Sequence, residues 1–170
     1  MITIYSSKIK QIDQDSYNSF VDSLHLSSLK CPKCKHHHFV KHGYYSRTLK
    51  YRNKTVSLRI LRVKCLSCGS THAILLYFIV PYSQYALEVH LKAIQSKFID
   101  HFLEWIGWNE NIAEYSYYYI HKQYRKRWKQ RLISENISLC PNLFKDCFKH
   151  FSMQFMQIKC TKNIFIPLST

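Results

Sequence analysis

Two pairs of cysteines stand at the spacing that a metal ion requires. The first pair reads Cys31-Pro-Lys-Cys34, and the second, thirty residues further on, reads Cys65-Leu-Ser-Cys68. Each CxxC sequence can form a tight turn with both sulfurs on one side, and two such turns on a β-hairpin bring four thiolates around zinc. Gly69, directly after the second pair, suits such a turn because glycine tolerates positive φ. The pattern predicts a closed four-cysteine site whose zinc is structural, since no position is left for a substrate.

Three other interpretations of these residues stay open. Redox or disulfide pairs also use CxxC, although a redox motif normally occurs once, at the start of a helix. Iron fits the same sulfur cage as zinc. A histidine can replace one cysteine ligand, and five histidines lie near the pairs: His36, His37, His38, His42 and His72. The remaining cysteines lack ligand spacing, which predicts buried free thiols at Cys140, Cys147 and Cys160.

Charge indicates the kind of partner. The chain has 25 Lys and Arg residues against 10 Asp and Glu residues, a formal net charge of +15. No acidic residue occurs between Asp22 and Glu88, nor in the run from Tyr115 to Ser134. AT-rich coding would raise the lysine content everywhere, but it would not clear the acids from two blocks. The distribution favours a polyanion, with nucleic acid ahead of an anionic membrane surface.

The two acid-free blocks supply the candidate contacts. In the first block, cations on a hairpin and its tip are predicted to contact phosphates: Lys41, Arg47, Lys50, Arg52 and Lys54. In the second block, polar residues on a helix are predicted to reach base edges: Lys122, Gln123, Arg125, Lys126 and Lys129. A solvated basic helix face is the alternative, although the block contains no acidic residue for pairing along the helix. Cross-strand packing is the favoured role of the hairpin tyrosines, Tyr44, Tyr45 and Tyr51.

Hydrophobic patterning predicts the β-rich elements that must position the cysteines. Residues 30–81 contain three strand-like runs, at 39–47, 55–64 and 72–80. The alternation of apolar residues changes phase between Ile60 and Leu61, which indicates a bulge or burial on both faces.

The second half of the chain has helical spacing. Residues 82–106 are predicted to form one helix, capped by Ser83, with an apolar stripe made of Leu87, Leu91, Ile94, Phe98, Phe102 and Trp105. A second helix is predicted to run from about Asn111 or Ser116 to Ser134, and a further amphipathic helix is predicted within 135–170. The expected fold class is α+β, a small zinc ribbon followed by a helical, helix-turn-helix-like region. The segments are 1–29, 30–81, 82–134 and 135–170.

Several short motifs around the cysteine pairs match a known pattern. They are Cys31-x-x-Cys34, His42-Gly43-x-Tyr45-x-Arg47, Arg62-Val63-x-Cys65-x-x-Cys68, Thr71-His72-Ala73 and Pro81-Tyr82-Ser83. The series resembles an uncharacterised bacterial family with a zinc ribbon like the N-terminal ribbon of certain insertion-sequence transposases, followed by a helix-turn-helix. The resemblance covers residues 30–134. It implies binding to DNA, most simply duplex DNA, in transposition or mobile-element regulation, with a transposase or recombinase as a candidate partner.

The helix-turn-helix part matches this family less well. Such motifs usually have a short turn and small hydroxyl residues where this chain has Ser116-Tyr117-Tyr118-Tyr119. The pair Trp128-Lys129 fits the end of a recognition helix. The position of the base-contacting residues along the helix therefore stays open.

The acidic residues do not suggest an active site. A transposase holds two divalent ions with a carboxylate triad on an RNase-H-like core. Most acidic residues of this chain lie on predicted helices, and the sequence after residue 134 leaves no room for such a core. The sequence contains no Gly-rich phosphate loop and no nucleophile elbow. We therefore expect a non-catalytic DNA-binding chain. An RNA-binding ribbon and a protein-interaction module that partners a transposase are the alternatives.

The sequence also predicts where the chain works. The N-terminal stretch MITIYSSKIKQIDQDSY is polar and mixed in charge, so we expect no signal peptide. The longest apolar run, 73–80, is too short to span a bilayer. Cysteines without an export signal favour metal-bound or reduced thiols in the cytoplasm.

Overall fold

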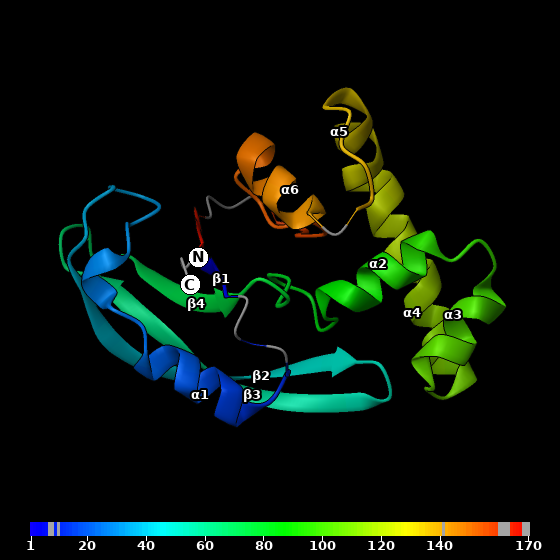
Figure 1. The fold of residues 1–170 in the computed structure, drawn as a ribbon, viewed down its shortest axis with the longest axis horizontal. Helices are drawn as coiled ribbons and strands as arrows, with labels where there is room; N and C mark the ends of the chain where they lie inside the picture. The colour runs from blue at the N-terminus through cyan, green and yellow to red at the C-terminus, as the bar shows by residue number, and fades with distance from the viewer. Residues whose placement is uncertain (7–8, 10, 141, 160–163, 168–170) are drawn as a thin grey trace.

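A five-stranded sheet and a helical arm make up the α+β fold, which confirms the predicted class (Figure 1). The computed structural model describes residues 1–6, 9, 11–140, 142–159 and 164–167. The strands are β1 (Ile2–Tyr5), β2 (Phe39–Tyr51), β3 (Lys54–Cys65), β4 (Thr71–Leu76) and β5 (Ile164–Pro167). The helices are α1 (Gln14–Asp22), α2 (Leu87–Gln95), α3 (Ile99–Ile106), α4 (Glu110–Gln123), α5 (Lys129–Ser134) and α6 (Leu143–Phe151). Helices α2 to α5 make up the helical arm. A 3-10 turn, η1 (Leu26–Ser28), and a π-helical stretch, η2 (Tyr124–Trp128), complete the described elements.

The long hairpin of β2 and β3 is the main feature of the sheet. Its antiparallel register runs from Phe39 opposite Cys65 to Tyr51 opposite Lys54, so the cysteine pairs lie at one end and a tight turn at the other. Ile60 and Leu61 are both fully buried. Adjacent strand residues point to opposite faces, so the phase change seen in the sequence arises from burial on both faces of β3.

Two short strands extend the sheet beyond β4. The sequence predicts no strand in residues 1–29 and only helix in residues 135–170. In the structure β1 pairs in parallel with β4, and β5 pairs in parallel with β1. Each of these strands has four residues, which is too few to show an alternating pattern. The sheet therefore joins both outer segments to the ribbon.

Helix α1 fastens onto the sheet through a buried tyrosine. The helix begins at Asp13, whose carboxylate accepts a hydrogen bond from the Ser16 amide at 2.7 Å. The hydroxyl of Tyr17 donates to the Ile74 carbonyl at 2.9 Å and accepts from the Leu61 amide at 3.0 Å. Since the paired register of β3 and β4 stops one residue earlier, this hydroxyl replaces the next ladder bond between the two strands.

The predicted helix over 82–106 is two helices in the structure. Helix α2 stops at Ser96, whose hydroxyl and amide both hydrogen-bond to the Lys92 carbonyl. A serine that bonds to the preceding turn in this way competes with the helical backbone. Phe98, expected in the apolar stripe, is 56% exposed at the break. The stripe is therefore divided between two helices with different directions.

Ser83 is not a helix cap, which corrects a second expectation. Helix α2 begins after Ala86 and has no side-chain cap. The Ser83 hydroxyl instead accepts from the Tyr85 amide at 3.0 Å and lies 2.9 Å from Nε2 of the buried His90. Ser83 therefore organises the loop before the helix.

The second predicted helix is confirmed in its extent. Helical structure is continuous from Glu110 to Ser134 and includes the π-helical stretch; we call this continuous segment the long helix. Trp128 is fully buried on its inner face. The predicted amphipathic helix near the C-terminal end corresponds to α6, which ends at Ser152 in a left-handed conformation. Phe155 is buried beyond that end. Among the described helices, none combines the length and apolar character needed to cross a membrane.

Replacing Tyr17 with phenylalanine tests the bridge between β3 and β4. Tyr17→Phe should lower the free energy of unfolding by about 2 kcal/mol, because the Leu61 amide and the Ile74 carbonyl lose a partner in a buried site. Urea unfolding of the metal-loaded protein measures this change. Tyr44→Phe is the matched control, since Tyr44 is 46% exposed on the hairpin, and should change the stability by less than about 0.5 kcal/mol. Equal stability of the two variants would contradict the bridge.

Candidate metal centre and basic surfaces

The two cysteine pairs form turns with the same backbone geometry. In the first turn the Lys35 amide donates to the Cys31 carbonyl at 2.9 Å, and in the second the Gly69 amide donates to the Cys65 carbonyl at 2.8 Å. The fifth residue is left-handed in both, with φ 69° at Lys35 and φ 70° at Gly69. The conformation expected at Gly69 is confirmed, and Lys35 adopts it without the freedom of glycine.

These turns bring four sulfurs together. The sulfurs of Cys31 and Cys68 are 3.7 Å apart, those of Cys34 and Cys65 are 3.5 Å apart, and all four lie within 4.8 Å of one another. Sulfurs at about 2.3 Å from a tetrahedral zinc are separated by about 3.8 Å. The four cysteines therefore form a site that can hold a metal ion.

The surroundings favour thiolates over thiols at part of this site. Cys31 and Cys65 are buried, while Cys34 and Cys68 are half-buried. Hydrogen bonds from the side chain and the backbone of Ser70 lower the pKa of Cys68 to about 6. A sulfur that is ionised at neutral pH binds a metal cation without first losing a proton.

One histidine, His72, lies against the sulfur cluster. Its Nε2 is 3.4 Å from the sulfur of Cys31, and the ring is buried. Burial, together with the positive charge of the N-terminus, lowers the pKa of His72 to about 4, so the ring is neutral at neutral pH. A neutral ring with a proton on Nε2 can donate to the Cys31 sulfur and orient it. In the described part of the chain, the ligand cluster consists of cysteines alone.

The other predicted histidine candidates face solvent. His36, His37, His38 and His42 are all exposed. His36 Nδ1 lies 3.1 Å from the Cys34 carbonyl, which supports the first turn from outside.

The remaining cysteines lie apart from the metal-ligand cluster. Cys147 is fully buried, and burial raises the pKa of its thiol, as expected of a core residue. Cys140 is half-buried, so the expectation of burial holds less well there. Cys160 lies outside the described residues.

Three of the predicted phosphate contacts on the hairpin have partners inside the molecule. The Arg47 guanidinium donates to the carbonyls of Val80 and Ser83 at 2.5 and 2.6 Å. The Lys50 ammonium lies 5.8 and 5.6 Å from the ring centres of Tyr85 and Trp108. These contacts join the hairpin to the helical arm.

Arg52 at the hairpin tip makes the third of these contacts. It pairs with Glu88 at 3.0 Å and lies over the rings of Tyr51 and Trp105. The partners of the three cations come mainly from residues 80–108, far along the chain, which is why spacing within the hairpin did not indicate them. Lys41 and Lys54 are exposed, and so is Arg52 in spite of its pair with Glu88.

The helical candidates lie mostly in solvent. Lys122, Arg125, Lys126 and Lys129 are exposed. Gln123 is half-buried, and its side-chain oxygen accepts from Arg127 Nε at 3.0 Å. The exposed cations follow the second half of the long helix, from the end of α4 into α5.

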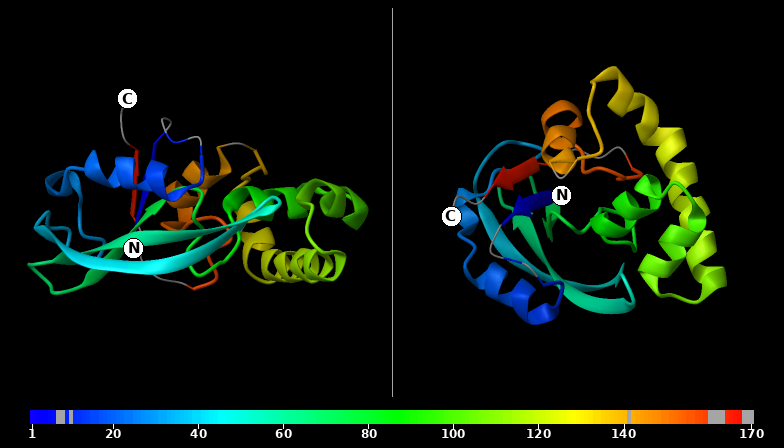
Figure 2. Two further views of the ribbon diagram at one scale, coloured as in Figure 1. Left: turned by 90° about the horizontal axis from the view of Figure 1, so that it is seen from below. Right: turned by 45° about the vertical axis from the view of Figure 1, so that its right-hand side comes forward.

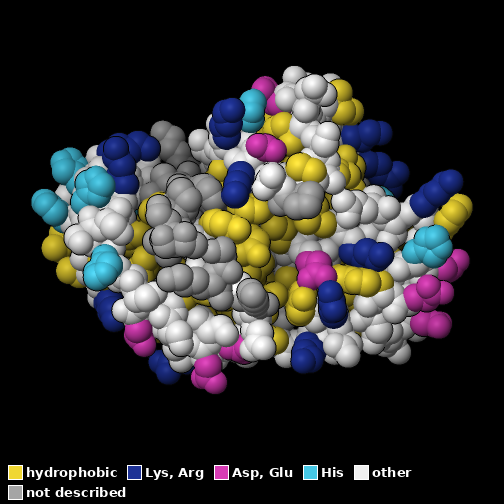
Figure 3. Space-filling view, in the orientation of Figure 1, with side chains coloured by type: hydrophobic (Ala, Val, Ile, Leu, Met, Phe, Trp, Pro, Cys, Tyr) yellow, Lys and Arg dark blue, Asp and Glu magenta, His cyan; other side chains and the backbone are white. Residues whose placement is uncertain are grey.

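Helices α3 and α4 are joined by a short turn, residues 107–109, in which Gly107 has φ 62°. The distribution of charge on this helix pair is the opposite of the one expected for a DNA-reading helix. The acidic residues lie on α3 and the first half of α4: Asp100, Glu104, Glu110 and Glu114. Figure 3 shows acidic side chains gathered around α3 and basic ones along α5. A recognition helix normally presents its N-terminal residues to the bases, and here the first turn of α4 carries Glu110, whose carboxylate would repel phosphates.

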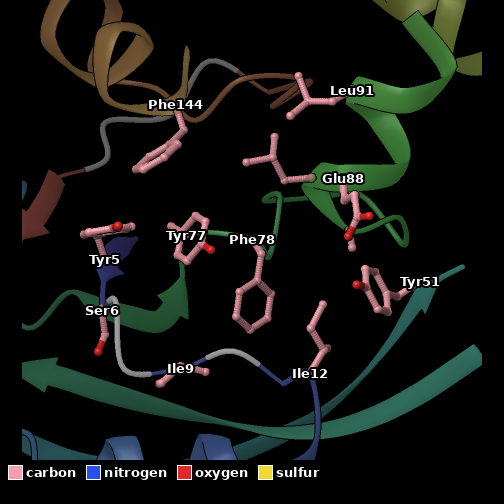
Figure 4. Close-up of a pocket in the computed structure, with 12 residues that line it drawn as sticks. Tyr5, Ser6, Ile9, Ile12, Tyr51, Tyr77, Phe78, Glu88, Leu91 and Phe144 are labelled. Atoms are coloured by element: carbon pink, nitrogen blue, oxygen red, sulfur yellow. The ribbon is translucent and has the colours of Figure 1, made fainter. Parts of the chain in front are cut away.

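A cavity of about 500 Å³ lies between β1, the end of β4, α2 and α6 (Figure 4). Tyr5, Tyr77 and Phe144 form one wall, with ring centres 5.0 to 5.3 Å apart. Glu88 is the single carboxylate among the described lining residues, and it is paired with Arg52.

Comparison with known proteins adds one match. A protein-family model described as "Domain of unknown function (DUF6431)" matches residues 29–104. That segment contains the four cysteines, the hairpin, α2 and most of α3, whereas α4 and α5 lie beyond it. No curated protein and no solved structure matches the chain.

Removing one sulfur tests the metal site. Cys65→Ser should abolish stoichiometric metal binding and unfold the cysteine end of the hairpin, because metal binding supplies folding free energy there. Mass-spectrometric metal analysis of the purified protein and amide hydrogen exchange of residues 31–72 measure the two effects. Cys140→Ser should keep both the metal and the protection, since Cys140 is outside the cluster. Freshly purified wild-type protein with neither zinc nor iron would refute the site.

Proposed function

We propose that this chain is a non-catalytic, zinc-dependent DNA-binding protein that acts in transposition or in the regulation of a mobile element. The observation that carries the proposal is the acid-free helical surface formed by Lys122, Arg125, Lys126 and Lys129, all exposed. No acidic residue occurs from Tyr115 to Ser134 to neutralise it. Such a surface attracts a polyanion and contacts its phosphates.

Zinc is the proposed metal. Four thiolates in a compact cage suit zinc, whose preferred geometry is tetrahedral, and the separations of 3.7 and 3.5 Å between paired sulfurs agree with its size. A closed site of four cysteines has no open coordination position, so bound zinc would supply a structural cross-link and no chemistry. Cys31, Cys34, Cys65 and Cys68 would hold it.

The cross-link supports binding indirectly. It fixes the end of the hairpin from which Lys41 projects, and the hairpin body holds the helical arm through Arg47, Lys50 and Arg52. The proposed interface consists of the four helical cations, and Lys41 and Lys54, at opposite ends of the hairpin, are further candidate phosphate contacts. Because α3 and the start of α4 are acidic, we assign contact to the second half of the long helix rather than to its N-terminal end.

The link to transposition rests on the resemblance of the cysteine motifs to transposase ribbons. A transposase or recombinase is the proposed protein partner. The same cations would serve for structured RNA, which is the rival target. Competition between duplex DNA and double-stranded RNA of equal length for the purified protein separates the two, and preference for RNA would contradict the DNA proposal.

Charge reversal on the helix tests the interface. Lys122→Glu/Lys129→Glu should weaken duplex DNA binding and reduce the slope of log affinity against log salt by about two, one for each phosphate that a lysine no longer neutralises. Fluorescence anisotropy with a labelled duplex across a salt titration measures both quantities. The matched control is Lys97→Glu/Lys149→Glu, because both of its lysines are exposed outside the acid-free blocks and the net charge changes equally. Equal losses of affinity in the two variants would reduce the effect to bulk charge and contradict the proposed interface.

A further inference from the structure

One side of the long helix carries an aromatic hollow. It has a volume of about 320 Å³ and is lined by Tyr82, Ser83, Gln84, Tyr85, Tyr115 and Tyr119. The rings of Tyr115 and Tyr119, one helical turn apart, are nearly parallel, with ring centres 6.4 Å apart and planes inclined by 16°. Tyr115 is 69% exposed, and Tyr82 is 43% exposed. Two of the tyrosine side chains that line this hollow are thus exposed to solvent.

A second hollow on the same helix is cationic. It has a volume of about 390 Å³ and is lined by Lys126, Arg127, Gln130, Arg131, Met153, Gln157 and Ile158. Arg127 donates to the Gln123 side chain and, at 2.7 Å, to the Ile158 carbonyl. A guanidinium has five N–H donors, so these two bonds position Arg127 and leave further donors for an anion. No acidic residue is among the described residues that line this hollow.

The segment after α6 connects the two hollows. Ile158 lines the cationic hollow, and the ammonium of Lys159 lies 5.0 Å above the ring of Tyr82 in the aromatic one. The Trp128 ring nitrogen donates to the Gln157 carbonyl at 3.2 Å, which holds this segment beside the helix. Figure 2 shows the segment running close to the long helix.

The two hollows also follow one another along one continuous helix. Tyr115 and Tyr119 are four residues apart on α4, and Lys126 lies further along, in the π-helical stretch η2. We refer to the two hollows together as the groove, aromatic at one end and basic at the other.

We propose that this groove binds single-stranded nucleic acid, with bases stacked on Tyr115 and Tyr119 and phosphates held by Lys126, Arg127 and Arg131. Proteins that bind unpaired strands combine aromatic platforms with a cationic path in this way. A duplex keeps its bases stacked on one another, so exposed tyrosine faces offer it little. The inference deepens the proposed function and rests on it, because it assigns the groove to an unpaired stretch of the same nucleic acid.

Truncating one exposed ring tests the groove. Tyr115→Ala should weaken binding of a labelled single-stranded oligothymidylate by at least about fivefold, the loss expected when one stacked base loses its platform. Tyr115→Phe keeps the ring and should bind like the wild type. The matched control is Tyr118→Ala, on the same helix, where Tyr118 is 54% exposed and packs against Tyr117 outside the groove. Anisotropy titrations give the affinities, and circular dichroism checks the fold.

The cationic end supplies an independent variant. Arg131→Gln removes a cation that lines the groove and is outside the proposed duplex interface, so it should weaken single-strand binding. Both Arg131→Gln and Tyr115→Ala should leave duplex binding close to that of the wild type. Equal effects of Tyr115→Ala and Tyr118→Ala, or duplex binding without single-strand binding, would overturn the groove and leave the proposed function intact. Single-strand binding without duplex binding would instead support the groove and overturn the duplex DNA proposal.

Discussion

The convergence of four cysteine sulfurs is the constraint on which the other features depend. The loop that carries Cys31 and Cys34 meets the turn after β3 at this point, where the Leu66 amide also donates to the His38 carbonyl. Thiolates this close repel one another unless a cation lies between them. Without a metal, the four thiolates would push the two cysteine turns apart, whereas a bound metal ion would hold the turns together. Strand β2 starts only five residues after Cys34, with its first residue opposite Cys65. The metal site therefore sets the starting register of the long hairpin.

The hairpin connects the metal site to the helical arm. Three hairpin cations contact groups from residues 80–108. Arg47 donates to a carbonyl, Lys50 lies over an aromatic ring, and Arg52 pairs with a carboxylate. These residues look like phosphate ligands in the sequence, and the structure gives them internal partners. Among the predicted contacts, most of the exposed cations lie on the second half of the long helix, at Lys122, Arg125, Lys126 and Lys129. Charge on this chain has two roles, cohesion along the hairpin and proposed recognition on the helix, and only the three-dimensional structure separates them.

The features that could be predicted from the sequence are those whose cause is local. CxxC spacing predicted the cysteine cluster, glycine after Cys68 predicted the left-handed turn, and apolar periodicity predicted the hairpin and the helix that ends at Ser134. Features whose cause is distant in the chain were missed. Strands β1 and β5 are too short for a pattern, and they form because β1 pairs with the edge of β4 and β5 pairs with the edge of β1.

Two further features depend on contacts that no sequence pattern reports. The break at Ser96 depends on a hydroxyl bonded to the preceding turn. The basic hollow beside Lys126 is lined in part by the segment after α6, which packs against the helix through the bond from Trp128 to the Gln157 carbonyl.

X-ray absorption spectroscopy of the purified, untreated protein tests the central claim most directly, because it reports both the metal and its ligands. We expect an absorption edge of zinc and a single ligand distance of about 2.3 Å that fits four sulfurs, with His72 outside the coordination sphere, 3.4 Å from the Cys31 sulfur. A spectrum that requires nitrogen or oxygen ligands in place of sulfur, or a metal-free protein with the cysteines paired as disulfides, would contradict the account.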